Sequence, residues 1–196
     1  MSGESINQNI MKEISLNELR KIQIDILDKV HNFCIQNNIT YFLSSGTLLG
    51  AIRHGGYIPW DDDIDLYMPR ESYERFINIY KDDSHDTRVI TLYNNKEYYY
   101  PFAKVEDTNS IVIENVPEKF NIGINIDIFP IDGVPNNLIC RKFFFMKNEL
   151  LQFFRYKIIT ADLNKPRSAL KHIILSILIK FLKRYSMRDL ALLIDE

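Results

Sequence analysis

The feature that most limits the fold is a short segment in which acidic and apolar residues alternate. From Asp63 to Met68 the sequence reads Asp-Ile-Asp-Leu-Tyr-Met, and a period of two residues is typical of a half-buried strand. Asp63 and Asp65 then project side by side from one face, while the apolar residues anchor the strand in a core. The segment therefore predicts a strand that is buried on one side and carries carboxylates on the other.

The rest of the chain is large enough to supply that core. Its 196 residues are 46% hydrophobic, which suits one globular domain, or one domain with a small helical appendage. The formal charge of −2 argues against a nucleic-acid binder, which would be strongly basic. Residues 1–14 read as a loose polar tail without the apolar core of a signal peptide, so we expect a cytoplasmic protein. Cys34 and Cys140 lie far apart, without the spacing of zinc or redox sites.

Helices are predicted on both sides of the acidic strand. Ser15 and Glu18 form a capping box at the start of an amphipathic helix over about 15–38. A short apolar strand over 40–44 and a short helix over 47–54 follow. After the acidic strand, another amphipathic helix contains the series Tyr73, Phe76, Ile77 and Tyr80.

The second half of the chain changes from strands to helices. Turn residues separate the predicted β segments, which are 88–93, 98–107, 109–116 and 123–131. Helices are predicted from 136 to about 160 and from 166 to 185, and Ser186 with Asp189 caps a last short helix. We therefore expect a core domain in residues 1–135 and a helical extension in 136–196.

Three carboxylates are candidates for a metal site. Asp63 and Asp65 share a strand face, and Asp127 stands alone between isoleucines on a later β segment. If the strands are neighbours, these side chains meet, and Mg²⁺ prefers such hard oxygen ligands together with phosphate oxygens. One carboxylate could instead serve as a general base. An acidic run is otherwise most often a solvated loop, and a lone strand aspartate can simply cap a turn.

Small and basic residues near these acids are candidate substrate contacts. Ser45, Gly46 and Thr47 form a small-residue turn whose N–H groups can face a phosphate. The basic candidates for phosphate or nucleotide contacts are Arg53, His54 and Lys104. For any one of these three, however, we favour the alternative of an ordinary surface cation.

An intensely apolar run occupies residues 173–182. It is too short to span a bilayer as a helix, and Lys180 interrupts it. Basic residues flank the run, so it could lie peripherally on an anionic membrane surface. The alternative, which we favour, is an ordinary helix packed on the domain.

One long signature resembles that of the LicD family of phosphotransferases, to which fukutin-related proteins are also similar. Its first part, residues 46–54, reads Gly-Thr-Leu-Leu-Gly-Ala-Ile-Arg-His, and residues 58–65 read Ile-Pro-Trp-Asp-Asp-Asp-Ile-Asp. The match continues through 68–73 and 102–105 into Asp127-Ile-Phe-Pro-Ile-Asp-Gly133. It therefore covers the chain from about the first helix to Gly133.

The resemblance implies an α+β fold of the polymerase-beta nucleotidyltransferase type, with a small mixed sheet flanked by helices. In that superfamily a Gly-Ser or Gly-Thr turn precedes an Asp-x-Asp strand, and a later strand supplies a third acid. Here these become Gly46-Thr47, then Asp63 with Asp65, and Asp127. Asp61 shares their strand parity and could also hold the metal, whereas Asp62 is expected to face the other way.

The resemblance also implies an activity. Members transfer phosphocholine from CDP-choline, or a related phospho-alcohol such as ribitol phosphate, to a sugar of lipopolysaccharide or teichoic acid, and CMP leaves. We therefore expect a Mg²⁺- or Mn²⁺-dependent phosphotransferase with a glycan or glycolipid acceptor, in the cytoplasm or at the inner face of the membrane. Family members usually continue well beyond this length, so the helical extension looks truncated.

Two other functions remain open at this point. A true nucleotidyltransferase would move a nucleoside monophosphate and release pyrophosphate instead of CMP. A chain that lacks the family's C-terminal segment could also be a non-catalytic remnant that binds a nucleotide or a glycan.

Overall fold

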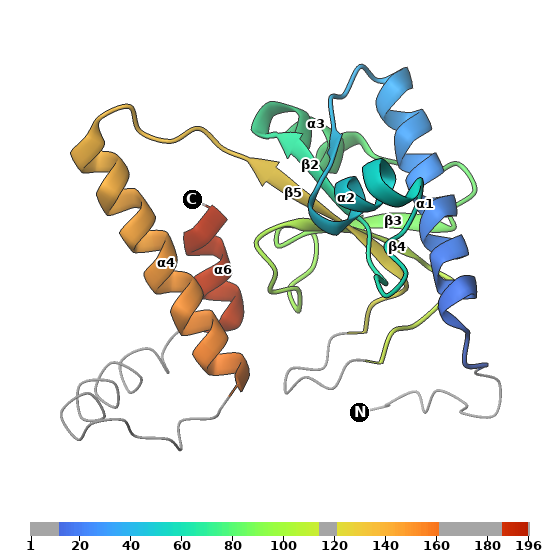
Figure 1. Ribbon diagram of the computed structural model, residues 1–196. Coiled ribbons are helices and arrows are strands. Elements are labelled where there is room, and N and C mark those ends of the chain that lie inside the picture. Colours follow the sequence, from blue (N-terminus) through green and yellow to red (C-terminus); the bar gives the residue numbers. More distant parts are fainter. Residues whose placement is uncertain (1–11, 114–120, 161–185, 196) are drawn as a thin grey trace.

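In a computed structural model, the structure describes residues 12–113, 121–160 and 186–195, and it has a mixed sheet flanked by helices (Figure 1). The helices are α1 (Leu16–Gln36), α2 (Ser45–His54), α3 (Arg70–Ile79), α4 (Leu138–Thr160) and α6 (Met187–Asp195). The strands are β1 (Phe42–Leu43), β2 (Asp65–Pro69), β3 (Thr87–Ile90), β4 (Ala103–Asp107) and β5 (Asn125–Ile131). This arrangement confirms the expected α+β class with a C-terminal helical segment.

The five strands form one sheet in the order β1-β2-β5-β4-β3. The β2–β5 pair is parallel and the other pairs are antiparallel. Parallel neighbours need a long crossover connection, and the chain between β2 and β5 contains α3, β3 and β4. The acidic strand and the strand of Asp127, which lie far apart in sequence, are thus central neighbours.

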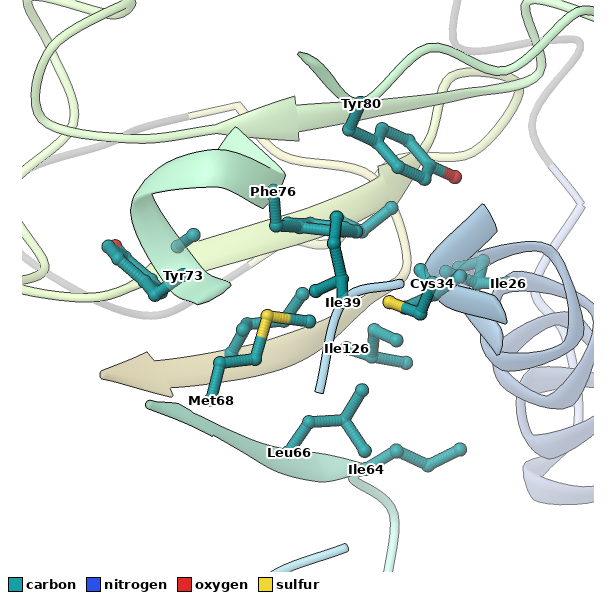
Figure 2. Close-up of a cluster of buried hydrophobic side chains, with 14 residues drawn as sticks. Ile26, Cys34, Ile39, Ile64, Leu66, Met68, Tyr73, Phe76, Tyr80 and Ile126 are labelled. Atoms are coloured by element: carbon teal, nitrogen blue, oxygen red, sulfur yellow. The ribbon is translucent and has the colours of Figure 1, made fainter. Parts of the chain in front are cut away.

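One face of the sheet carries the main hydrophobic core (Figure 2). Leu66 and Met68 of β2 and Ile126 of β5 point from the strands toward Phe76 of α3, and Ile26 comes from α1. All are at most 1% exposed. Since each apolar side chain so buried contributes about 1.5–3 kcal/mol, this face fixes which way the alternating residues of β2 and β5 point.

The first helix confirms its predicted start. The Ser15 hydroxyl accepts from the backbone N–H of Glu18, and the Glu18 carboxylate accepts from that of Ser15. The reciprocal pair satisfies two of the N–H groups that a helix start leaves without partners.

Several strand predictions were too long. The acidic strand begins at Asp65 rather than Asp63, and the first strand is reduced to Phe42–Leu43. The strand predicted over 98–107 begins only at Ala103. Of the segment over 109–116, the described part contributes an isolated bridge between Val112 and Ile122. β propensity overestimates strands where no neighbour is available to complete the ladder.

The C-terminal helices α4 and α6 pack beside each other (Figure 1), and α6 also contacts the core domain. The predicted cap of α6 is confirmed, because the Asp189 carboxylate accepts from the N–H and hydroxyl of Ser186. Ala191 of α6 packs with a second core cluster, and Arg188 donates to backbone carbonyls of Asn95 and Tyr98. The division of the chain at residue 135 stays a prediction.

None of the helices in the described ranges is long and apolar enough to cross a bilayer. The helix predicted over 166–185, with its apolar run 173–182, lies outside the described residues.

Candidate functional site

The site is built on two neighbouring strands whose aspartates face each other. Asp65 of β2 is the register partner of Asp127 of β5, and the Asp127 N–H donates to the Ile64 carbonyl over 2.8 Å. Side chains opposite each other on paired strands share a face. The alternating core residues face the other way, so both carboxylates point away from the core. The prediction that Asp65 and Asp127 meet on adjacent strands is confirmed.

Lys104 lies against the same pair. It is the register partner of Asp127 from β4, and its Nζ lies 2.5 Å from Asp127 Oδ1 and 3.0 Å from Asn125 Oδ1. The residue is only 9% exposed. Lys104 therefore belongs to the site, although here it binds a carboxylate, and its predicted contact with phosphate stays a prediction.

The small residues that precede the acidic segment form the first turn of α2 rather than a free turn. Thr47 Oγ1 accepts from the Asp65 N–H over 2.9 Å, and Ser45, held at a positive φ of 48°, opposes the rise in the pKa of the Asp65 carboxyl group. A β-carbon at Gly46 would lie 2.4 Å from Asp61 Oδ2. Small residues thus allow the helix start to pack directly on two carboxylates, and the strained Ser45 backbone is typical of a functional site.

The first part of the acidic segment is a loop, so the prediction that strand alternation places Asp61 and Asp63 on one face and Asp62 on the other is wrong. Because the strand begins at Asp65, alternation does not govern Asp61, Asp62 and Asp63. A carboxylate oxygen of each lies within 4.8 Å of the others, so Asp62 stays near its neighbours instead of facing away. Exposed carboxylates on consecutive loop residues are common without an ion, and we give more weight to the pair that the strand register fixes.

The carboxylates raise one another's proton affinity. Partial burial, reinforced by Asp65, Asp61 and Asp62, raises the pKa of Asp63 to about 6. Burial also raises the pKa of Asp65, with Asp127 adding to the effect and Ser45 opposing it. Both shifts disfavour the charged form, as expected where carboxylates lie close together without enough positive charge.

Two residues of α1 hold the acidic loop, and neither was predicted from the sequence. The Arg20 guanidinium donates to the backbone carbonyls of Ile58 and Pro59 over 3.0 and 2.9 Å, and its Nε donates to that of Asp61 over 3.0 Å. Gln23 donates to the Asp62 carbonyl over 2.9 Å. Their spacing of three places them on one helix face, but nothing in a sequence identifies a side chain whose partners are backbone carbonyls.

Two predicted substrate contacts lie at the other end of α2 from the small residues. Arg53 and His54 lie in the last turn of α2, about 12 Å along the helix from Ser45 at 1.5 Å per residue. Both are exposed, and the Arg53 Nε contacts His54 Nδ1. Their predicted contact with a phosphate or nucleotide stays a prediction.

The donor set fits a hard divalent cation. Asp65 and Asp127 offer carboxylate oxygens fixed by strand register, Asp61 and Asp63 extend the set, and their crowding disfavours ionisation unless a cation is added. Oxygen ligands of this kind suit Mg²⁺ and Mn²⁺ and do not suit softer metals.

Several known proteins are similar to this chain. The chain is 38% identical over 128 residues to the lipopolysaccharide cholinephosphotransferase LicD of Haemophilus influenzae. The aligned residues make up 64% of this chain and 48% of that protein. An uncharacterised protein of Rickettsia prowazekii is 34% identical over 128 residues, 56% of this chain and 42% of its own length. The human ribitol 5-phosphate transferase FKRP is 61% identical over 28 residues, 14% of this chain and 6% of that enzyme.

The chain spans about half the length of the two bacterial relatives. No solved structure matches it. The sequence profile of the LicD/FKTN/FKRP nucleotidyltransferase domain matches residues 38–166, a range that contains the acidic segment, Lys104 and Asp127. Since this match covers well over half of the chain and includes every carboxylate of the site, the chain belongs to the LicD/FKTN/FKRP nucleotidyltransferase-domain family.

Proposed function

We propose that the protein is a divalent-metal-dependent phosphotransferase. It transfers a phospho-alcohol, phosphocholine in the first place, from a CDP-activated donor to a hydroxyl group of a cell-surface glycan or glycolipid and releases CMP. The observation that carries the proposal is the register pair Asp65 and Asp127 beside Lys104, in a chain of this family.

The relatives support the choice of substrate class. One is named as a cholinephosphotransferase of lipopolysaccharide and another as a ribitol 5-phosphate transferase, so both names describe the transfer of a phosphorylated alcohol.

The side chains of the site divide the work. Asp63, Asp65 and Asp127 would hold Mg²⁺ or Mn²⁺, with Asp61 as a further ligand, and the bound cation would neutralise phosphate charge and polarise the phosphoryl group. Lys104 can exchange its bond to Asp127 for one to a phosphoryl oxygen. Ser45, Gly46 and Thr47 line the edge of the site through the start of α2.

The reaction breaks one bond and forms another at the same phosphorus. The acceptor oxygen attacks the phosphorus nearest the alcohol, the bond from that phosphorus to the bridging oxygen breaks, and CMP leaves with the bond's electrons. One of the carboxylates could instead serve as the general base that accepts the proton of the attacking hydroxyl.

A donor screen tests the proposal. The protein is incubated with CDP-choline, CDP-ribitol or CDP-glycerol, with Mg²⁺ or Mn²⁺ and a lipopolysaccharide or teichoic acid acceptor, and CMP is measured. Asp65→Asn and Asp127→Asn should abolish its release. Asp83→Asn, which changes an exposed aspartate of another acidic run, should not.

The two alternatives give different results in the same screen. When the screen also includes CTP, which can donate CMP and lose pyrophosphate, release of pyrophosphate from CTP without release of CMP from any CDP donor would identify a nucleotidyltransferase and overturn the proposal. Donor binding in isothermal titration without release of either product would identify a non-catalytic binding domain.

A further inference from the structure

A row of aromatic side chains lies beside the carboxylates on the same face of the sheet. Tyr67 is two residues beyond Asp65 on β2, Phe129 is two residues beyond Asp127 on β5, and the two are register partners. Phe42 of β1 is the register partner of Tyr67. Phe102, directly before β4, continues the row beyond Phe129. Since alternate residues share a strand face, carboxylates and rings form two adjacent rows.

The rings contact one another and remain open to solvent. The Tyr67 and Phe129 centroids are 6.0 Å apart at 76°, and those of Phe129 and Phe102 are 4.3 Å apart. Tyr67 is 40% exposed and Phe42 51%, while Phe129 and Phe102 are half-buried. Aromatic rings held by neighbouring strands yet left partly exposed offer π faces to a ligand at little entropic cost.

The ammonium group of Lys104 already lies beside one ring of this row. Lys104 Nζ lies 5.1 Å from the centroid of Tyr100 and 5.5 Å from that of Phe102, within the range of a cation–π interaction. Because this ammonium group is also paired with Asp127, its charge is compensated. The protein's own cation therefore already lies beside Phe102. The next two rings of the row, Phe129 and Tyr67, are where a ligand group would lie.

The spacing of the two rows selects the part of the donor that reaches the rings. Two residues of strand span about 7 Å. In a phosphocholine group, four bonds of about 1.5 Å each separate phosphorus from the nitrogen, so a phosphate at the carboxylates brings the trimethylammonium group to the rings. The cytosine base is separated from that phosphorus by a second phosphate and a ribose, which places it beyond the row.

We propose that Tyr67 and Phe129 form a subsite for a quaternary ammonium group, the choline end of the donor. The inference rests on the proposed phosphotransfer and names its substrate. A cation without N–H groups needs no hydrogen-bond acceptors and is attracted by ring faces, which matches these two rings. A polyol such as ribitol would need hydrogen-bond partners for each hydroxyl group, and the Tyr67 hydroxyl is the polar group that these two rings supply.

The test compares CDP-choline with its uncharged isostere, CDP-3,3-dimethylbutanol, in which carbon replaces the nitrogen. Binding of each to the full chain with Mg²⁺ is measured by isothermal titration. We expect the charged donor to bind about tenfold more tightly, which corresponds to about 1.4 kcal/mol. Phe129→Leu and the more exposed Tyr67→Leu should reduce that ratio toward one, while Phe143→Leu, on α4 and also exposed, should leave it unchanged. Circular dichroism verifies that each variant is folded.

Three outcomes would overturn the inference. Equal binding of both donors by the unaltered protein would exclude recognition of the charge. A ratio that survives in both folded ring variants would place the ammonium group elsewhere. Binding of CDP-ribitol or CDP-glycerol but not CDP-choline would reject the choline subsite and leave the phosphotransferase proposal standing, whereas a failure of all CDP donors to bind would remove both.

Discussion

The chain contains two aspartate-rich runs, residues 61–65 and 82–86, and α1 holds both of them by opposite means. From α1, Lys29 reaches the second run and binds carboxylates, at 2.8 Å from Asp82. Also from α1, Arg20 reaches the first run and binds backbone carbonyls instead. The helix therefore neutralises one run and merely positions the other.

The second run is satisfied within the protein. Asp82 accepts from Lys29, from the N–H and hydroxyl of Ser84, and from those of Thr87. Partial burial alone would raise the pKa of Asp82, but the bonds from Lys29, Ser84 and Thr87 outweigh it and hold the pKa below its usual range. Such a carboxylate stabilises the turn and has little capacity left for a ligand.

The first run shows the reverse. Its backbone is anchored, its side chains crowd one another, and the pKa values of Asp63 and Asp65 rise. Carboxylates that a protein positions without neutralising them are suited to binding an external cation. The difference between two runs of similar composition thus separates a structural role from a functional one.

The largest expected effect is on activity. Asp65→Asn should lower CMP release by on the order of a thousandfold, because charge stabilisation by a metal is worth several kcal/mol, and should leave the thermal midpoint unchanged or higher. Asp82→Asn should instead cost about 1–3 kcal/mol of stability with activity per folded molecule retained. Equal loss of activity in both folded variants would contradict the distinction.

The next largest effect is that of Mg²⁺ on thermal stability, which should depend on the first aspartate-rich run and not on the second. Mg²⁺ at 100 times its dissociation constant should stabilise the protein by about 2.7 kcal/mol, seen as a rise in the midpoint of thermal unfolding that EDTA reverses. Asp65→Asn should abolish the rise and Asp82→Asn should preserve it. A rise that survives Asp65→Asn would place the ion elsewhere.

The two basic residues of α1 provide a matched pair. Arg20→Met should weaken Mg²⁺ affinity by roughly 10–100-fold, the usual cost of losing a group that orients metal ligands. Lys29→Met should lower stability and leave the affinity of the folded protein unchanged. Isothermal titration calorimetry with Mg²⁺ measures the affinity of both variants. Unchanged affinity in folded Arg20→Met would show that the acidic loop keeps its conformation without Arg20.

The smallest effect concerns pH in the absence of metal. The pKa of Asp63 rises from 3.8 to about 6 in the folded state, so its contribution to stability is present below about pH 4 and is lost as pH rises through 6. Asp82, whose pKa is lowered from 3.8, contributes above pH 4 and loses this contribution as pH falls. Solvent screening limits the Asp63 change to about 1 kcal/mol.

Urea unfolding in EDTA between pH 2 and 7 detects these opposite slopes, that of Asp82 below pH 4 and that of Asp63 between pH 4 and 7. Relative to the unaltered protein, Asp63→Asn should gain stability as pH rises, and the penalty of Asp82→Asn should shrink as pH falls. Slopes of the same sign in both variants would contradict the assignment.

Local patterns predicted the elements whose signals lie within a few residues. The capping boxes at Ser15 and Ser186 were correct because their partners are three residues away. The alternation around Asp65 correctly predicted which side chains face the core, even though the strand began two residues later than expected. Boundaries were less accurate because a strand ends where its neighbour ends, which local propensity does not encode.

The sequence by itself determined that Asp65 lies on a half-buried strand and that Asp127 lies on another, because alternation is a local property. Only the tertiary structure decided that these strands are parallel neighbours in register, that Lys104 binds Asp127, and that Arg20 holds the acidic loop. Those contacts join residues far apart in the chain, and their formation depends on how the whole core packs. The same reason explains why the aromatic row of Phe42, Tyr67, Phe129 and Phe102 was invisible in the sequence, where each of its members stands on a different segment.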